Sequence, residues 1–306
     1  MFVFRRLSGS VPGMSIPSAF RHLVDDAAIF PPGRLPLEEA VPAHRDHVGA
    51  AHAELVGPFV VDLDRLDLLV RQVADSHQGE VLDVSVVVPA PAEVGTVVRT
   101  VAASPGLRLE SLEVKTEVDH HDVRLIADAV PPDVTVFLEL PRPAHPRWTE
   151  LLDTTVDHGW SAKFRTGGLE AQAFPTESEV ARWIVAVVEA DVPFKCTAGL
   201  HRALRHQDAA TGFEHHGYLN ILLATVRARH GADRATVSSV LAETDPESVV
   251  TALRNLEHGT LEGARHSFVS YGSCSILEPL EDLTVLGLVP PAVSTPETAV
   301  HRGESR

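Results

Sequence analysis

Two similar stretches of the sequence each place a lysine at the end of a short apolar run. The first is WSAKFRTGG at Trp160–Gly168, and the second is VPFKCTAGLH at Val192–His201. In both stretches small residues and a glycine follow the lysine. An unprotonated lysine amine attacks carbonyl carbons and forms Schiff bases. The chemistry that these stretches could perform is therefore covalent catalysis by Lys163 or Lys195.

The two lysines would influence each other if their strands are neighbours. Adjacent ammonium groups in a partly desolvated pocket disfavour each other's charge, which lowers the pKa of one of them. One of the two lysines would then form the Schiff base, and the other would keep it unprotonated before attack. A structural alternative is a closed charge network, because a buried lysine or glutamate is costly unless it is paired. In that network Lys163 pairs with Glu139. Lys195 pairs with Glu113 in the same way.

Elements of secondary structure must bring these lysines together, and apolar runs of strand length recur along the chain. We predict eight strands, at Leu23–Phe30, Leu55–Asp62, Val81–Val88, Leu107–Lys115, Val134–Leu140, Trp160–Arg165, Val192–Thr197 and His266–Tyr271. We predict six helices between them, at Leu37–His52, Leu66–Ser76, Ala92–Ala103, Asp122–Ala129, Trp148–Asp157 and Glu177–Ala190. Near-continuous apolar runs are typical of parallel strands that helices cover on both faces. Their number favours an α/β fold of the (β/α)8 TIM-barrel type over an open sheet.

A long segment, residues 202–262, separates the seventh predicted strand from the eighth. It contains TGFEHHGYLNILLATVRARHG and DPESVVTALRNLEHG, which are typical of helices, so we predict a helical insertion between strands seven and eight. We expect residues 1–13 to be a disordered N-terminal arm and residues 14–288 to form a single barrel domain. Residues 289–306 are polar and are expected to be a disordered tail.

Composition limits the classes of partner. The chain has 306 residues, with 26 basic and 42 acidic side chains and a formal net charge of −16. This charge repels phosphate backbones and anionic lipids, so we expect no nucleic-acid and no membrane partner. Two cysteines, Cys196 and Cys274, make no disulfide framework, which fits a reducing cytoplasm. The sequence leaves formation of a homo-oligomer open.

In a TIM barrel the active site lies where the strands end, so polar residues at those ends are the candidates. The candidate catalytic residues are Lys163, Lys195, Glu113, Glu139 and His201. The candidate substrate-binding residues are Arg165, Gly167, Gly199, Gly272, Ser273 and Ser275. The glutamates would move protons, and His201 follows the second lysine turn, where a general acid or base would be useful. Arg165 and the Gly272–Ser275 turn would hold a phosphate or carboxylate.

Other polar residues near the strand ends stay undecided. Asp25 or Asp26 in LVDDAAIFPPG could lie at the mouth of the barrel, although aspartate before a Pro-Pro-Gly turn is also common in loops. His215 or His216 would either cap the helix that follows or reach the pocket, and capping is favoured. Cys196 directly follows Lys195 on a strand, so it should point the other way, toward the helices.

The lysine motifs also carry a family resemblance. AKFRTGG, then FKCTAGL, then FVSYGSCS as the last strand together resemble the deoxyribose-phosphate aldolase group of class I aldolases. That family is a (β/α)8 barrel with a Schiff-base lysine at the end of strand six and a second lysine at the end of strand seven. The two motifs K-x-R-T-G-G and F-K-x-T-A-G-L-H also resemble those of a group of bacterial and plant proteins. The match covers chiefly residues 107–200 and 266–276.

The resemblance implies roles for several of the candidates. Lys163 matches the Schiff-base lysine, Lys195 its neighbour, and Gly272, Ser273 and Ser275 a phosphate-binding turn. Glu113 stands near the place of a proton-relaying aspartate, and Glu139 ends strand five as a glutamate does in the family. The implied function is a lyase that forms a lysine Schiff base with a small anionic carbonyl metabolite and needs no dissociable cofactor.

The chain departs from the family in three respects. Arg165 replaces a small residue, a glutamate stands for the aspartate at position 113, and the insertion that carries His215 and His216 has no counterpart. Two other functions therefore stay open. In one, Glu113 and Glu139 hold Mg²⁺ for enolate-type chemistry, which needs a third oxygen ligand. In the other, the barrel binds an anionic metabolite without turnover.

Overall fold

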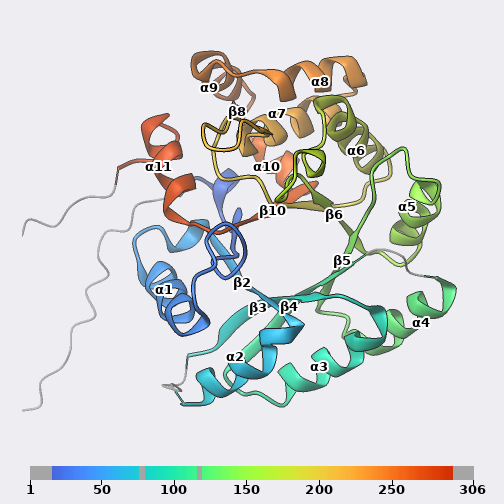
Figure 1. Cartoon of the computed structure of the whole chain (residues 1–306). Coiled ribbons are helices and arrows are strands. Elements are labelled where there is room, and N and C mark those ends of the chain that lie inside the picture. The colour runs from blue at the N-terminus through green and yellow to red at the C-terminus, as the bar shows by residue number, and fades with distance from the viewer. Residues whose placement is uncertain (1–15, 76–79, 116–118, 292–306) are drawn as a thin grey trace, which may run out of the picture.

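Eight parallel strands of the chain close into a barrel in the order β1-β10-β7-β6-β5-β4-β3-β2 (Figure 1). The structure is a computed structural model, and it describes residues 16–75, 80–115 and 119–291. The barrel strands are β1 (Val24–Asp26), β2 (Val56–Asp62), β3 (Leu82–Val88), β4 (Leu107–Val114), β5 (Thr135–Glu139), β6 (Ser161–Arg165), β7 (Phe194–Thr197) and β10 (Phe268–Ser273). Every neighbouring pair of these strands is parallel. The predicted α/β TIM barrel is confirmed.

Helices surround the barrel on its outer face (Figure 1). They are α1 (Leu37–Gly49), α2 (Leu63–Asp75), α3 (Val94–Ala102), α4 (His120–Ala129), α5 (Trp148–Asp157), α6 (Glu177–Glu189), α7 (Tyr218–Arg229), α8 (Arg234–Ala242), α9 (Pro246–Arg254), α10 (Thr260–Arg265) and α11 (Leu277–Val285). Side chains alternate along each strand, so every second residue faces these helices. On β6, Phe164 is such a residue, and its ring stacks on Trp183 of α6 with centroids 4.8 Å apart. The first six helices correspond to the six predicted ones.

Every predicted strand differs from the structure at one end or both, most by one or two residues, and the differences at β1 and β10 bear on the site. β1 has three residues rather than the eight of Leu23–Phe30, because the chain turns back after Asp26. The amide of Phe30 donates to the carbonyl of Ala27 in that turn. β10 begins two residues later than predicted and ends at Ser273. Gly272 and Ser273 therefore belong to the last strand and not to the turn after it.

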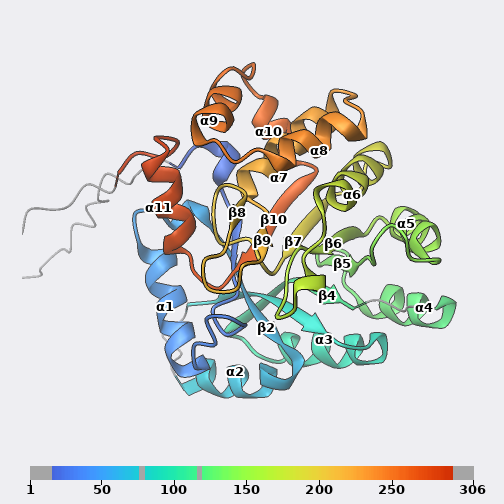
Figure 2. The same cartoon turned by 45° about the horizontal axis from the view of Figure 1, so that its top comes forward.

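The insertion between β7 and β10 is helical, as predicted, but it also contains a short antiparallel hairpin. The hairpin strands are β8 (His206–Gln207) and β9 (Glu214–His215), and helices α7 to α10 follow them. Helix α7 is buried along nearly its whole length and contacts α6, α8, α10 and β10. The hairpin carries Phe213, whose ring lies 5.4 Å from that of Phe174 in the loop after β6. It therefore lies beside that loop, at the carboxyl end of the strands (Figure 2).

One continuous apolar core extends from Ile16 to Val289. Val289 is buried, although the predicted disordered tail begins at this residue. The predicted arm at residues 1–13 lies outside the described residues, as do residues 292–306 of the tail. Within the part of the chain that the structure describes, no helix has both the length and the apolar composition that a membrane span requires.

A substitution at Gly217 tests how closely the insertion packs at the start of α7. A Cβ at this position would overlap the backbone of Ala203 and Leu204, so only glycine lets α7 begin this close to the preceding loop. We expect Gly217→Ala to lower the free energy of unfolding by about 1–3 kcal/mol, the usual cost of overpacking. Urea denaturation measures this change.

Gly263→Ala is the matched control for Gly217→Ala. Gly263 lies within α10, and nothing lies within 4 Å of a Cβ added there. Because alanine favours helices over glycine, this variant should gain up to about 1 kcal/mol. Equal stability of the two variants would contradict the close packing at Gly217.

Candidate active site

Lys163 and Lys195 lie side by side inside the barrel. They are paired in register on the neighbouring strands β6 and β7, and each side chain is about 1% exposed. The residues that follow them, Phe164 and Cys196, face the helices and belong to the apolar core. The predicted outward direction of Cys196 is confirmed. Two ammonium groups in this interior need counter-charges, because an unpaired buried charge is strongly unfavourable.

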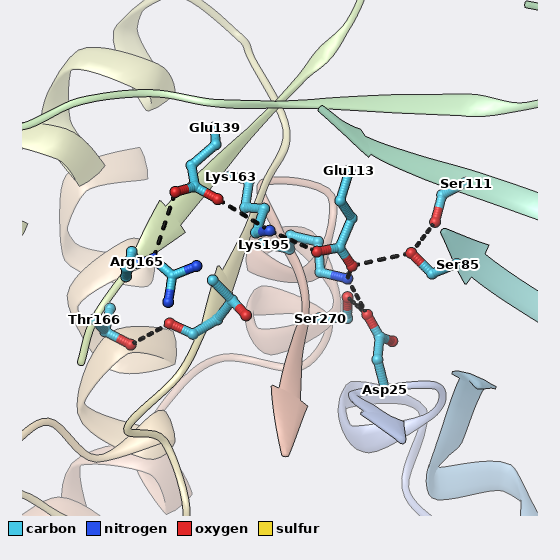
Figure 3. Close-up of polar contacts among 11 residues, drawn as sticks. Asp25, Ser85, Ser111, Glu113, Glu139, Lys163, Arg165, Thr166, Lys195 and Ser270 are labelled. Carbon is cyan, nitrogen blue, oxygen red and sulfur yellow. Dashed lines mark hydrogen bonds and ion pairs between the residues drawn. The ribbon is translucent and has the colours of Figure 1, made fainter. Parts of the chain in front are cut away.

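Three carboxylates supply those counter-charges (Figure 3). Lys163 Nζ lies 2.7 Å from Glu113 Oε2 and 3.1 Å from Glu139 Oε2. Lys195 Nζ lies 2.6 Å from Glu113 Oε1 and 2.5 Å from Asp25 Oδ2. Glu113 therefore bridges the two lysines, with one oxygen on each. The arrangement is closer to the charge-network alternative than to two lysines that only repel each other.

Serine hydroxyls and one aromatic ring orient this network. Ser85 Oγ donates to Glu113 Oε1 at 2.9 Å and accepts a hydrogen bond from Ser111 at 2.7 Å. Ser270 Oγ donates to Asp25 Oδ2 at 2.9 Å. Lys195 Nζ also lies 5.1 Å from the centroid of the Phe137 ring, a favourable cation–π distance. The carboxylates are thus held by fixed donors as well as by the lysines.

The charges inside the barrel shift the pKa values of their neighbours. Burial opposes ionisation of Glu113, but the two ammonium groups outweigh burial and hold its pKa well below the usual range. Burial likewise opposes the charge of Lys195, but Asp25 and Glu113 outweigh it and raise the pKa of this lysine. Burial raises the pKa of Asp25 in spite of its contact with Lys195. Repulsion between the ammonium groups therefore does not decide the state of Lys195, which stays protonated.

Asp25 enters the network from β1, which lies on neither side of β6 or β4. The sequence analysis left Asp25 undecided, because aspartate before a Pro-Pro-Gly turn is also common in loops. Side chains meet across the barrel interior as well as along its wall, and Lys195 connects Asp25 to Glu113 in this way. Gly57 on β2 makes room for Asp25, since a Cβ there would overlap the Asp25 carboxylate.

A cavity of about 870 Å³ opens at the carboxyl end of the strands. Lys163 and Glu113 are among its lining residues, whereas Lys195, Asp25 and Glu139 are not. Of the two barrel lysines, Lys163 is thus the amine that faces the cavity. Lys195 contacts the cavity-lining Glu113 and is not itself part of the lining.

Arg165 and His201 line the same cavity. Arg165 is 45% exposed, and its Nε lies 3.4 Å from Glu139 Oε1. Lys163 and Arg165 together outweigh burial and lower the pKa of Glu139. His201 Nδ1 lies 3.5 Å from Glu278 Oε2 and 3.6 Å from Cys274 Sγ. Burial lowers the pKa of His201 in spite of Glu278.

The two predicted substrate-binding glycines, Gly167 and Gly199, contact each other. A Cβ on Gly167 would lie 2.9 Å from Gly199 Cα, and Gly199 has a φ of +77°. The loops after β6 and β7 can approach this closely only because both residues lack a side chain. Gly199 lines the cavity and Gly167 does not. In the structure the two glycines hold the loops after Lys163 and Lys195 together. Their contact with a substrate stays a prediction.

The predicted anion-binding turn at Gly272–Ser275 is engaged mainly with its own backbone. Ser273 Oγ donates to the Ser275 carbonyl at 2.8 Å, and Ser275 Oγ accepts from the Glu278 amide at 3.2 Å near the start of α11. Gly272 lines the cavity, but Ser273 and Ser275 do not. Anion binding by the two hydroxyls would therefore require them to leave these contacts.

The favoured prediction that His215 or His216 caps a helix is wrong. The N-cap of α7 is Gly217, and no side chain caps it. His215 lines the cavity, and its Nδ1 lies 3.2 Å from the Gly199 carbonyl oxygen. His216 Nε2 lies 2.8 Å from the Pro175 carbonyl oxygen. The hairpin thus places one of the two histidines at the cavity.

The small number of lysines in the sequence also marks this site, and motif spacing alone does not use that signal. The chain has only three lysines among its 26 basic residues, namely Lys115, Lys163 and Lys195. Lys115 directly follows β4 and lines the cavity mouth. All three amines are therefore inside the barrel or at its mouth, and arginine is the basic residue everywhere else. Lysine differs from arginine in that its amine can lose a proton and act as a nucleophile.

Glu113 and Glu139 are poorly placed to share a metal ion. Both oxygens of Glu113 contact ammonium groups, and Lys163 lies between the two glutamates. Within residues 16–75, 80–115 and 119–291, no group of three His, Cys, Asp or Glu side chains has the arrangement of a metal site. The donor set at the described site therefore suits amine chemistry better than Mg²⁺ coordination.

Comparison with known proteins adds little to this geometry. No protein-family model and no curated protein sequence matches the chain. Among solved structures, the chain is similar to the carboxyl transferase domain of Rhizobium etli pyruvate carboxylase with 3-bromopyruvate, at 11% sequence identity and a TM-score of 0.42. The likeness covers 81% of this chain and 48% of that one, so the chain spans about half of that structure's length. The strand pairing itself establishes the TIM barrel.

Glu113→Gln tests whether the shared carboxylate holds the barrel interior together. Removing one partner of a buried ion pair typically costs about 3–5 kcal/mol, and we expect a loss of this size. The pKa of Glu113 is lowered in the folded protein, so its contribution to stability is present above pH 4.5, the ordinary value, and is lost as the pH falls below it. The variant should lose this part of the acid dependence, measured by urea unfolding between pH 3 and pH 7.

The exposed Glu281 on α11 provides the control. Glu281→Gln should change stability by less than about 0.5 kcal/mol, as for most surface substitutions. If Glu113→Gln were as mild as this control, the two lysines would not depend on the shared carboxylate.

Proposed function

We propose that the protein is a lyase of the class I aldolase type, in which Lys163 forms a Schiff base with a small anionic carbonyl substrate. The observation that supports this most is that Lys163 lines the cavity while contacting two carboxylates, Glu113 and Glu139. Lys195 lacks this access to the cavity. The mechanism requires no dissociable cofactor.

Attack on a carbonyl needs Lys163 as the neutral amine. Its proton can pass to Glu113 or Glu139, which lie within hydrogen-bond distance. Glu113 is held ionised by two ammonium groups, so protonating it is costly. Glu139 contacts one lysine and the partly exposed Arg165, and it is the better acceptor. Glu139 is therefore the general base of the first step, and Glu113 stays charged.

The covalent steps then follow from the position of these groups. The Lys163 nitrogen adds to the carbonyl carbon, and a proton moves from that nitrogen to the carbonyl oxygen to give a carbinolamine. Protonation of its hydroxyl by Glu139 releases water and leaves a protonated imine. When the bond between the α and β carbons breaks, its electron pair forms the carbon–carbon double bond of an enamine, and the π pair of the protonated imine moves to nitrogen. A carboxylate receives the proton of the hydroxyl that becomes the second carbonyl.

Cationic groups at the cavity favour an anionic substrate. The contact of Arg165 with Glu139 uses Nε, so its Nη groups can reach a carboxylate or phosphate in the cavity. Lys115 adds a second cation at the mouth. Lys195 acts as a positioning residue, because its charge keeps Glu113 ionised and thereby keeps Glu113 on Lys163.

Borohydride trapping tests the assignment of the nucleophile. We expect pyruvate, glyoxylate or glycolaldehyde phosphate with borohydride to add one adduct to the wild type, seen by intact-mass spectrometry. Lys163→Arg keeps the positive charge beside both glutamates but offers no nucleophilic amine, so it should abolish the adduct. Because arginine is larger than lysine at this buried position, thermal unfolding of the variant is measured alongside to show that it is folded.

Lys115→Arg is the matched control, since it makes the same change at the exposed lysine of the cavity. It should keep the adduct. Peptide mapping of the wild type gives an independent answer, because only three lysines compete. An adduct on Lys195 would reverse the roles of the two residues. No adduct with any of these carbonyl compounds, together with thermal stabilisation by pyruvate or phosphate, would favour a non-catalytic anion-binding barrel instead.

A further inference from the structure

The cavity in front of Lys163 is much larger than a small carbonyl compound needs. Its volume of about 870 Å³ lies in the upper part of the range of roughly 300–1,000 Å³ that is typical of sites for drug-sized ligands. A substrate of three or four carbon atoms would leave most of this space to water. The size therefore raises the question of what else the substrate carries.

The lining of the cavity is divided into a polar and an apolar side. The strands from β4 to β7 contribute Glu113, Lys163, Arg165 and Thr197. On the other side, β1, β2 and β3 are neighbours in the barrel. These three strands and the segments that follow them contribute the apolar residues Ala27, Phe30, Pro31, Pro32, Val60, Leu63, Val87 and Pro89. The apolar side thus faces the reactive amine across the cavity.

Two acidic residues interrupt the apolar side, and one of them is already engaged. Asp62, at the end of β2, accepts hydrogen bonds from the backbone and side chain of Arg65 at the start of α2. Asp64 lies on the first turn of the same helix. Both belong to the junction of β2 with α2, and the segments of β1 and β3 that line the cavity contribute no acidic side chain to it.

The rim of the cavity adds apolar side chains beside the polar ones of the insertion, which are Arg202, His206, Asp208, Thr211 and His215. Phe174 belongs to the loop after β6, and Phe213 belongs to the hairpin of β8 and β9. Leu169 also lines the cavity, yet it is 70% exposed. A leucine exposed to this extent at the mouth of a cavity gains buried area when an apolar ligand covers it.

We propose that the substrate of this site is an amphipathic carbonyl compound, with its anionic and carbonyl end at Arg165 and Lys163 and an extended alkyl or aryl chain along the apolar side. This inference rests on the proposed function for the position of the reactive carbon. The apolar side is the evidence for the alkyl or aryl chain, which would fill the space between β1, β2, β3 and the rim.

Chain length can be tested without any covalent step. Acetate, butanoate, hexanoate and octanoate carry the same anionic head on chains of increasing length, and isothermal calorimetry measures their dissociation constants. Burial of one methylene group contributes about 0.8 kcal/mol, which predicts an affinity gain of about threefold to fourfold for each added carbon. An affinity that does not change with chain length would overturn the inference.

Variants at the rim identify where the chain binds. Leu169→Ser and Phe213→Ser should each weaken octanoate binding several-fold while leaving acetate binding unchanged. Val285→Ser is the matched control, because Val285 is 80% exposed and lies on α11 outside the cavity lining. If Val285→Ser weakened octanoate binding as much as the rim variants, the chain would bind nonspecifically to the surface and the inference would be wrong.

Reactive analogues separate this inference from the proposed function. With borohydride, 2-oxooctanoate should give the Lys163 adduct at lower concentration than pyruvate if both proposals hold. Equal trapping of the two compounds would overturn the amphipathic substrate and leave the Schiff base in place. Octanoate binding that depends on the rim, without trapping of either 2-oxo acid, would overturn the Schiff base and leave an amphipathic anion as the ligand.

Discussion

The carboxylate of Glu113 is the one group on which the inside of this barrel depends. Its two oxygens each contact one buried ammonium group, at 2.7 and 2.6 Å. Without this shared counter-charge, Lys163 and Lys195 would be neighbours on adjacent strands with only Glu139 and Asp25 to offset their charges. The shared contact also fixes geometry, since a single rigid group sets the separation of two flexible side chains. The serine pair Ser85 and Ser111 then fixes Glu113 from the opposite side.

This network divides the lysines into two kinds of amine. Lys195 contacts Asp25 and Glu113, and these carboxylates raise its pKa and favour its protonated form. Lys163 contacts the same central carboxylate but lies at the floor of the cavity. Neighbouring segments hold the two lysines in these different positions. The glycine pair Gly167 and Gly199 holds the two lysine loops together, and the insertion places its hairpin beside them.

The sequence predicts the barrel well because a strand that is buried on both faces is an apolar run. Such a run can be recognised from neighbouring residues alone, without knowing what packs against it. The sequence also predicts that Lys163, Lys195, Glu113 and Glu139 share one end of the barrel. It does not predict that Asp25 joins them, because the strand carrying Asp25 is neither next to β6 nor next to β4, and contact across a barrel interior leaves no periodic signal. The hairpin of β8 and β9 was missed for a related reason: each of its strands has two residues, too few to show any alternation. The outcome for Ser273 and Ser275 shows a further limit, since a Gly/Ser-rich stretch can satisfy its own backbone as readily as a ligand.

The scarcity of lysine has a consequence for the protein in solution. Aldehydes and ketones react with accessible amines wherever they meet them, and most proteins present many such amines on their surfaces. Here the side-chain amines are confined to the barrel interior and its mouth, while the outer surface uses arginine, which stays protonated and does not form imines under ordinary conditions. Adventitious carbonyl damage to side-chain amines would therefore be concentrated at the site itself. Labelling of Lys163 by an amine-selective reagent would therefore report whether the cavity is open or occupied.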